Sequence, residues 1–574
     1  TNELAIHMGL PRHSVKGLPV VEHAAFGQEV ITRRNADADR INLGTIYNLG
    51  QETETEVCLN LNSLAMHTFI TGSTGSGKSN AVYHLLTEVR KKGIPFLVVE
   101  PAKGEYKDVF TDVRCYGTNP LVGEMLRINP FSFPKGIHVL EHIDRIVEIF
   151  NVCWPMYAAM PAVLKESIEN AYKSAGWDLD ISENEKIDNL FPTFDDVLIE
   201  LNKTINSSEY SSDTKGDYIG SLSTRIKSLT NGINGRVFVS DEMDLSELFD
   251  NSAIIDISRV GSVETKSLIM GLVVMKLQEY RMANAKEMNS PLRHITVLEE
   301  AHNLLKKTST EQSSDSSNMV GKSVEMLTNA IAEIRTFGEG FVIVDQAPDL
   351  LDTAAIRNTN TKIVLRLPES NDREITGNSI ALKEQQFDEL SKLPTGVAAV
   401  YQNDWQEAVL CKLPRYEAYD FAMNKKAEFV PAVKKLRAEN DELLHLLIKK
   451  NIEEDKIDIL KSKIMKSNVA AKVRKDLILN IQRRNAAYEW AVADFIKKNY
   501  DISDVFRGTK KENWSDLSEL CDIMISNLQS EFNDFSKNEM LIILYYVCRI
   551  EHELYPKQQS IEKLRVEYLR EKVM

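Results

Sequence analysis

A glycine-rich loop between an apolar strand and a helix constrains this chain more than any other feature. Residues 69–71 have the character of a strand end, residues 72–79 read G-x-x-x-x-G-K-S, and residues 80–86 suit the start of a helix. This is the arrangement of a P-loop, in which backbone N–H groups surround phosphates and the helix N-terminus stabilises their charge. The sequence therefore predicts binding of a nucleoside triphosphate.

The residue types within the loop predict separate roles. Lys78 is expected to contact the β- and γ-phosphates, and the hydroxyl group of Ser79 is expected to bind Mg²⁺. ATP and Mg²⁺ are therefore the expected cofactors. The expected nucleotide-binding residues are Gly72, Thr74, Gly75, Ser76, Gly77, Lys78, Ser79 and Asn80.

Two carboxylates and an amide end later strands of the same predicted sheet. The strand 294–298 runs into Glu299 and Glu300, and the strand 340–344 is followed closely by Gln346. Because the carboxyl ends of parallel strands meet at one edge, these side chains are expected beside the P-loop. We expect Glu299 in the water shell of Mg²⁺, Glu300 as the general base, and Gln346 as a sensor of the γ-phosphate.

The order of strands and helices predicts an α/β fold with a mostly parallel sheet. Apolar runs at 96–99, 252–257, 294–298, 340–344 and 361–365 alternate with helical patterns, and residues 396–401 and 407–410 suggest an edge hairpin. We expect a linker with short strands at 1–60 and an ATPase core at 61–420. A helical insertion is expected at about 135–235, and an all-α C-terminal domain at 425–574.

Composition limits the class of protein. The 574 residues predict about two to four domains. No apolar run is long enough to span a membrane, no signal peptide is visible, and the six cysteines show no C-x-x-C pair, so a cytoplasmic location is expected. The net charge of −15 argues against a broad DNA-coating surface, although a basic pore would remain compatible with it. The first residue is Thr1, which leaves open a missing N-terminal part.

Several motifs occur in an order that resembles the HerA branch of the HerA/FtsK superfamily. The P-loop is followed by E-E-A-H at 299–302, by a helix containing Arg335, and by the strand that leads to Gln346. Further similar stretches lie at 61–64, 67–68, 103–106 (K-G-E-Y) and 360–366, so the resemblance covers roughly residues 40–412. It implies a RecA-like P-loop NTPase core that assembles as a hexameric ring.

In such rings the nucleotide lies between subunits, and an arginine of the neighbour stabilises the transition state. Arg335 matches the family's arginine best, with Arg357 and Arg366 as weaker candidates. The chain departs from the family at Glu299, where an aspartate is usual, and at Met66, where an arginine is frequent. The family's N-terminal β-barrel is expected to be either absent from this chain or lost from its start.

A polar segment at 308–322 follows the E-E-A-H motif. Its composition indicates a disordered surface loop. The resemblance also allows a mobile pore loop, in which Lys322 would supply the charge.

The resemblance implies an ATP-driven helicase or translocase that moves or remodels duplex DNA. A nuclease or another effector subunit is the expected partner, in DNA processing or in antiviral (antiphage) defence. One alternative is an ATP-binding scaffold ring that activates an effector without translocation, which the acidic charge favours. The second alternative is a pumping ATPase of conjugation or type IV secretion.

Overall fold

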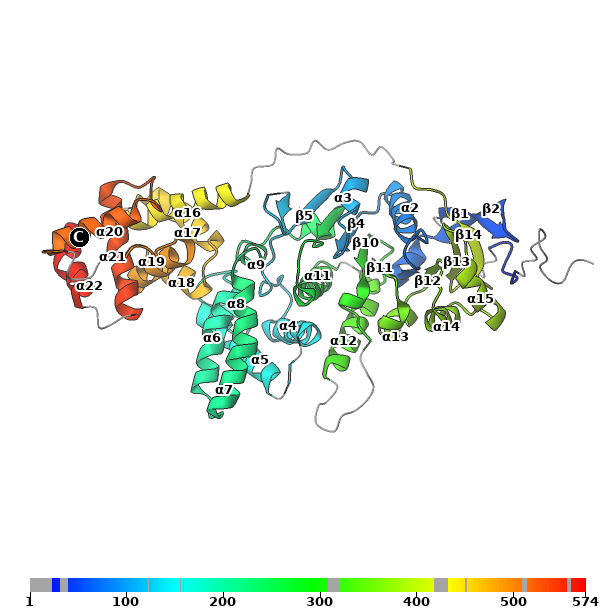
Figure 1. Cartoon of the computed structure of the whole chain (residues 1–574), viewed down its shortest axis with the longest axis horizontal. Coiled ribbons are helices and arrows are strands. Elements are labelled where there is room, and N and C mark those ends of the chain that lie inside the picture. The colour runs from blue at the N-terminus through cyan, green and yellow to red at the C-terminus, as the bar shows by residue number, and fades with distance from the viewer. Residues whose placement is uncertain are drawn as a thin grey trace, which may run out of the picture. The chain divides into compact units, whose positions relative to one another are not determined.

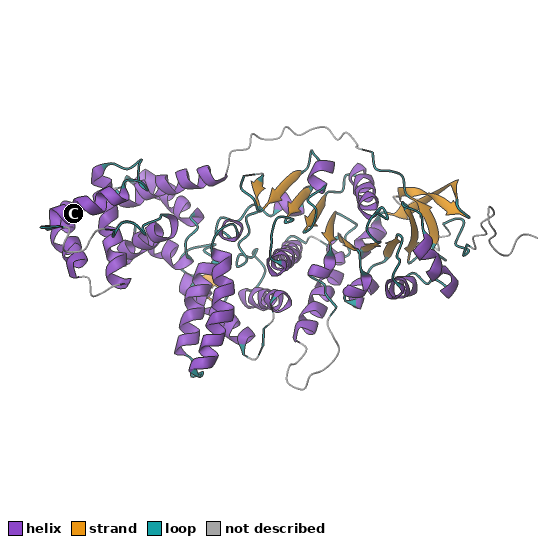
Figure 2. Ribbon diagram, in the orientation of Figure 1, coloured by secondary structure: helices purple, strands orange, loops and turns teal. Residues whose placement is uncertain are grey.

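The computed structural model describes residues 23–30, 40–121, 123–154, 156–157, 159–285, 287–307, 319–417, 432–449, 452–507, 514–554 and 559–573. The chain divides into two units (Figures 1 and 2). The first comprises residues 1–114 and 246–424, and the second comprises residues 115–245 and 425–574. No helix among the described residues is long and apolar enough to cross a bilayer.

Six parallel strands form the centre of the first unit, in the order β12-β3-β11-β10-β4-β9. All of their residues are buried, as is typical of a parallel sheet with helices on both faces. The strands are β3 (Thr68–Thr71), β4 (Phe96–Glu100), β9 (Ala253–Asp256), β10 (His294–Glu299), β11 (Glu339–Asp345) and β12 (Thr361–Val364). The predicted α/β fold with a mostly parallel sheet is confirmed.

Helices on the two faces connect these strands. Helix α2 (Lys78–Lys91) leads from β3 to β4, whereas α11 (Val263–Ala283) and α12 (Met319–Glu333) lead back in the opposite direction along the sheet. Right-handed crossovers therefore put α2 on one face and α11 and α12 on the other, as Figure 1 shows. Shorter helices of this unit are α3 (Tyr106–Val109), α10 (Ser246–Phe249), α13 (Thr353–Arg357), α14 (Ser370–Ser379), α15 (Glu384–Lys392), η1 (Asn62–Met66), η3 (Ala301–Asn303), η4 (Ile334–Phe337) and η5 (Pro348–Leu350).

Four antiparallel strands extend the sheet beyond β12. They are β13 (Val397–Gln402), β14 (Val409–Lys412), β1 (Arg40–Asn48) and β2 (Gln51–Asn60), in that order. The expected edge hairpin, β13–β14, is thus not at the edge, because β1 pairs with β14 and β2 forms the border. Strand β2 exposes several glutamates, which protect an open edge from pairing with another chain. Residues 1–22 and 31–39 of the expected linker lie outside the described part.

The second unit contains the expected insertion and the C-terminal helices. Strand pairs β5 (Arg114–Gly117) with β6 (Glu124–Met125) and β7 (Trp177–Asp178) with β8 (Glu183–Asn184) accompany the helices α4 (Val139–Cys153), α5 (Met160–Ala175), α6 (Phe194–Ser207), α7 (Ser212–Tyr218), η2 (Ile219–Ser223), α8 (Thr224–Thr230) and α9 (Asn234–Val237). The C-terminal helices are α16 (Ala432–Ile448), α17 (Glu454–Lys466), α18 (Ala471–Asn480), α19 (Ala486–Asn499), α20 (Leu517–Leu528), α21 (Lys537–Leu554), α22 (Gln559–Lys563), η7 (Leu564–Leu569) and α23 (Arg570–Val573).

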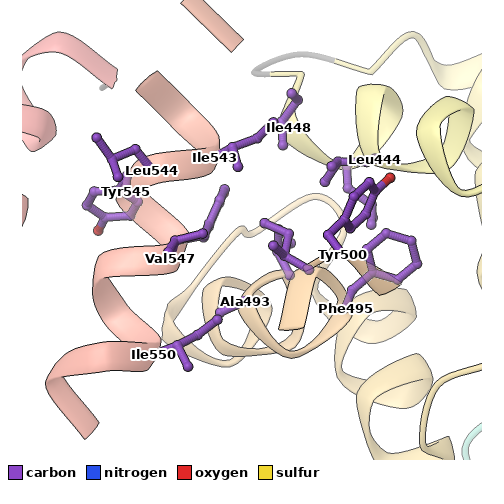
Figure 3. Packing of buried hydrophobic residues seen from close by; sticks show 14 of the residues in the cluster. Leu444, Ile448, Ala493, Phe495, Tyr500, Ile543, Leu544, Tyr545, Val547 and Ile550 are labelled. Carbon is purple, nitrogen blue, oxygen red and sulfur yellow. The ribbon is translucent and has the colours of Figure 1, made fainter. Parts of the chain in front are cut away.

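An apolar core holds the C-terminal helices together. Leu444 of α16, Phe495 of α19 and Val547 of α21 are fully buried and point toward one another (Figure 3). Burial of such side chains contributes about 1.5–3 kcal/mol each, so this core is the main source of stability for a segment without strands among its described residues.

Buried hydrogen bonds join these helices to the insertion. The carboxylate of Asp196 accepts hydrogen bonds from the N–H groups of Thr193 (2.9 Å), Ala471 (2.7 Å) and Lys472 (3.2 Å). The guanidinium group of Arg474 donates to three carbonyl groups, including that of Phe191 (2.7 Å). Burial lowers the pKa of Arg474 to about 10, and the charge of Asp196 opposes that shift. The insertion and the C-terminal helices therefore form one packed unit, while the domain limits expected from sequence stay a proposal.

Candidate nucleotide-binding site

The P-loop turns between β3 and α2 in a conformation that requires its glycines. Gly75 and Gly77 have φ angles of 76° and 106°, in the region that favours glycine. At Gly72, a Cβ atom would lie 2.6 Å from Ser76 Oγ and 2.8 Å from a carbon of Leu365. The G-x-x-x-x-G-K-S pattern thus follows from the space and the backbone angles of this loop.

Lys78 is a buried cation without a hydrogen-bond partner among the described residues. It is 9% exposed, and its Nζ atom lies 4.0 Å from Glu300 Oε1. Burial lowers the pKa of Lys78, and the charges of Glu300 and Glu299 oppose that shift. An unpartnered buried ammonium group is unfavourable, so an anion placed here would be stabilised strongly. The loop therefore fits the phosphate groups of a nucleotide.

The side chains of Glu300 and Gln346 meet at the loop. The Gln346 amide donates a hydrogen bond to Glu300 Oε1, and its oxygen accepts one from Thr74 Oγ1 at 2.8 Å. Glu300 itself follows β10 with φ 46°, a strained conformation for a residue with a side chain. The structure thus brings the expected base and sensor to the expected edge of the sheet, whereas their catalytic roles stay predictions.

Glu299 is held away from solvent by a phenol. Its side chain is buried, and Tyr106 Oη donates a hydrogen bond to Glu299 Oε1. Burial raises the pKa of Glu299, and the hydrogen bond from Tyr106 and the charge of Lys78 oppose that shift. The hydroxyl of Ser79 and the carboxylates of Glu299 and Glu300 are oxygen donors of the kind Mg²⁺ prefers, so the donor set fits this ion.

Asp345 and His302, for which the sequence predicted no role, also lie at this edge of the sheet. Asp345, the last residue of β11, is fully buried and accepts hydrogen bonds from the N–H group (2.8 Å) and Nδ1 (2.9 Å) of His302. The hydrogen bond to Asp345 raises the pKa of His302. Ligand atoms of Glu300, His302 and Asp345 lie within 4.8 Å of one another. The signal that could have found Asp345 is its position beside Gln346 at a strand end.

The side chain of Asn80 forms hydrogen bonds within its own chain. Its side chain donates to the carbonyl group of Pro414 (2.9 Å) and accepts from the N–H group of Tyr416 (2.7 Å). Its expected contact with the nucleotide stays a prediction. The Tyr416 ring packs edge-on against Tyr83 of α2, with centroids 5.7 Å apart.

The expected arginines lie at two different edges. Arg335 and Arg357 are exposed and, with Met66, line a surface cavity of about 260 Å³ at the amino ends of β3, β11 and β12. Strand β11, with seven residues, spans about 20 Å, so Arg335 lies far from the P-loop of its own chain. The carbonyl group of Arg366, in contrast, accepts the N–H group of Ser73 at 2.9 Å, on the P-loop side.

The polar segment at 308–322 lies mostly outside the described residues. Helix α12 begins at Met319 and carries Lys322, whose side chain is exposed. The choice between a surface loop and a pore loop therefore stays a prediction.

Comparisons with known proteins agree with this geometry. A family model described as "Helicase HerA, central domain" matches residues 41–277. The DNA double-strand break repair helicase HerA of Sulfolobus acidocaldarius is 26% identical over 399 residues, which cover 65% of this chain and 71% of the relative. The protein of the same name from Saccharolobus solfataricus is 24% identical over 375 residues, which cover 63% and 67%.

A solved structure shows the same fold. VirB4 of Thermoanaerobacter pseudethanolicus aligns with a TM-score of 0.50 and 18% identity, over 66% of this chain and 97% of VirB4. At this level of identity the likeness concerns the fold alone. The matched domain and the HerA relatives, together with the P-loop and the acids beside it, confirm the resemblance expected from sequence: this chain is a P-loop ATPase whose residues 41–277 match the central domain of the helicase HerA.

Proposed function

We propose that this chain is a motor that uses ATP hydrolysis to translocate or remodel double-stranded DNA. The observation that carries the proposal is the buried Lys78 ammonium group, which has no hydrogen bond among the described residues and lies 4.0 Å from the Glu300 carboxylate that Gln346 links to the P-loop. The relatives in the comparison are named DNA repair helicases, which supports DNA as the substrate.

The residues of the site divide the work of hydrolysis. Lys78 and the loop N–H groups hold the phosphates, and Glu300 accepts the proton of the attacking water. The hydroxyl of Ser79 and, through water, the carboxylate of Glu299 would hold Mg²⁺, which neutralises charge on the β- and γ-phosphates. Gln346 connects Glu300 to Thr74, so a change at the γ-phosphate position is transmitted to the base.

Self-association is part of the proposal. Arg335 lies at the opposite edge of the sheet from the P-loop, in a cavity whose described lining contains no acid. A phosphate bound to a neighbouring subunit is the ligand that such a cavity suits. We therefore infer a closed ring, most simply a hexamer, in which Arg335 contacts the neighbour's nucleotide and Arg357 lies beside it.

The partners beyond DNA follow from the family only. We propose a nuclease or other effector subunit, in DNA processing or antiphage defence, and a cytoplasmic location that suits the free cysteines. One specific observation favours a second candidate, a scaffold ring that activates an effector without translocation. The net charge of −15 leaves little basic surface for DNA.

Steady-state ATPase activity at low salt, with and without linear duplex DNA, tests the proposal. Glu300→Gln is the blank, and Glu54→Gln on the exposed face of β2 is the matched control. DNA stimulation that Glu300→Gln abolishes and Glu54→Gln retains would support a DNA motor. Turnover that ignores DNA would instead favour the scaffold ring, and turnover no higher than the blank would refute the motor.

A further inference from the structure

The K-G-E-Y segment at 103–106 is held in place by several buried or half-buried hydrogen bonds. It follows β4, whose last residue, Glu100, is buried. The Glu100 carboxylate accepts hydrogen bonds from the N–H groups of Glu105 (2.8 Å) and Tyr106 (3.3 Å). The turn after β4 is thus fixed at its far end by the strand that precedes it.

A second carboxylate holds Lys107, the residue that follows the segment, and lies close to Gly104 within it. Asp256, at the end of the neighbouring strand β9, accepts from Lys107 Nζ (2.6 Å) and from Ser258 Oγ (2.6 Å). Gly104 has a φ of 70°, and a Cβ atom there would lie 2.9 Å from Ser258 Oγ and 3.1 Å from Asp256 Oδ2. Only glycine satisfies both the backbone angle and this close approach.

These contacts position the side chain of Tyr106 beside the candidate nucleotide-binding site. Tyr106 is 2% exposed, and its phenol donates a hydrogen bond to Glu299 Oε1, 193 residues away in sequence. Its ring meets Tyr83 of α2 edge-on, with centroids 5.0 Å apart and planes at 86°. Burial of the ring, its contact with Tyr83 and the hydrogen bond to Glu299 together restrict the position of the Tyr106 side chain.

We propose that Tyr106 is a positioning residue that fixes the carboxylate of Glu299, so that its second oxygen faces the metal side of the nucleotide. A glutamate has one more rotatable bond than the aspartate usual in this family, and a buried hydrogen bond from a phenol removes that freedom. The inference rests on the proposed function, because it takes Glu299 as part of the Mg²⁺ shell. It assigns the K-G-E-Y segment as the support of that shell.

The binding of a non-hydrolysable ATP analogue, measured by calorimetry with Mg²⁺ and with EDTA, tests this role without turnover. Tyr106→Phe should reduce the gain in affinity that Mg²⁺ provides by about 10- to 100-fold, the usual effect of losing an outer-shell partner. Binding in EDTA should stay within about twofold, because the phenol does not touch the phosphates. Tyr488→Phe removes a comparable buried hydrogen bond (Tyr488 Oη to Leu447 O, 3.0 Å) and should change neither value.

A double-variant cycle separates positioning from general damage. If Tyr106 acts through Glu299, Glu299→Gln alone should remove most of the Mg²⁺ gain, and adding Tyr106→Phe should change it by less than about twofold. A full Mg²⁺ gain in Tyr106→Phe, an equal loss in EDTA, or independent effects of the two substitutions would each overturn the inference. Wild-type ATPase activity that ignores DNA would refute the motor and leave this binding test unaffected.

Discussion

Arg335 offers the sharpest test of how the site is completed. It lies before β11, whereas Gln346 lies after it, and the seven residues of that strand separate the two edges by about 20 Å. An arginine side chain cannot bridge that distance, so Arg335 can act only on the nucleotide of a neighbouring subunit. Arg335→Ala should lower the rate of ATP hydrolysis by about 10³-fold or more, as loss of a transition-state arginine does elsewhere.

Mixing two inactive variants tests whether Arg335 acts on the nucleotide of a neighbouring subunit. In rings built from Arg335→Ala and Glu300→Gln subunits in equal amounts, half of the interfaces carry an intact Glu300 and half of those face an intact Arg335. About a quarter of the interfaces are then complete, so about a quarter of the wild-type rate should return if interfaces act independently. The assay is steady-state ATPase activity of rings co-expressed with two different affinity tags and purified on both.

Inactive mixed rings would refute the action of Arg335 on a neighbouring subunit. If Arg335 served its own chain, each subunit would lack one essential group and the mixed rings would be as inactive as either parent. Arg335→Lys should recover little activity, because an ammonium group lacks the two-pronged geometry that contacts phosphate oxygens. Arg483→Ala, at an exposed position of the helical unit, is the control and should leave the rate unchanged.

Lys78→Ala removes the buried cation of the P-loop and should weaken nucleotide binding by at least about tenfold, measured by calorimetry. Asp196→Ala removes the acceptor of the N–H groups of Ala471 and Lys472 and should lower the free energy of unfolding of the helical unit by about 1–3 kcal/mol, measured by urea titration. Burial raises the pKa of Glu100 from 4.5 to about 7, so the folded state holds this proton more tightly than the unfolded state. Its contribution to stability should therefore fall as the pH rises from 4.5 to about 7, and Glu100→Gln should abolish that part of the pH dependence of the urea midpoint.

The features that the sequence predicted well are those whose chemistry is local. The P-loop is recognisable because its glycines are required by local geometry, by the backbone angles at Gly75 and Gly77 and by the approach of Ser76 at Gly72. The positions of Glu300 and Gln346 beside it followed from a topological rule, since parallel strands present their carboxyl ends at one edge. Both inferences needed the order of the strands and no knowledge of their packing.

The features that the sequence did not predict depend on contacts between distant residues. The hydrogen bond from Tyr106 to Glu299 joins positions 193 apart, and that from Ala471 to Asp196 joins positions 275 apart. The hydrogen bonds of the Asn80 side chain with Pro414 and Tyr416 likewise join positions more than 300 residues apart. No local pattern marks such pairs, because each partner alone is an ordinary polar or aromatic residue.

The arrangement of charges on the sheet also determines what kind of assembly can be active. The carboxyl edge carries Lys78 and Glu300, and the amino edge carries Arg335 and Arg357. A contact that brings the amino edge of one subunit to the carboxyl edge of the next would place Arg335 toward the neighbour's Lys78. A head-to-tail contact joins the two different edges, and such contacts close only as rings or continue as filaments. The proposed ring would use this separation at every interface, because each head-to-tail contact would join one amino edge to one carboxyl edge.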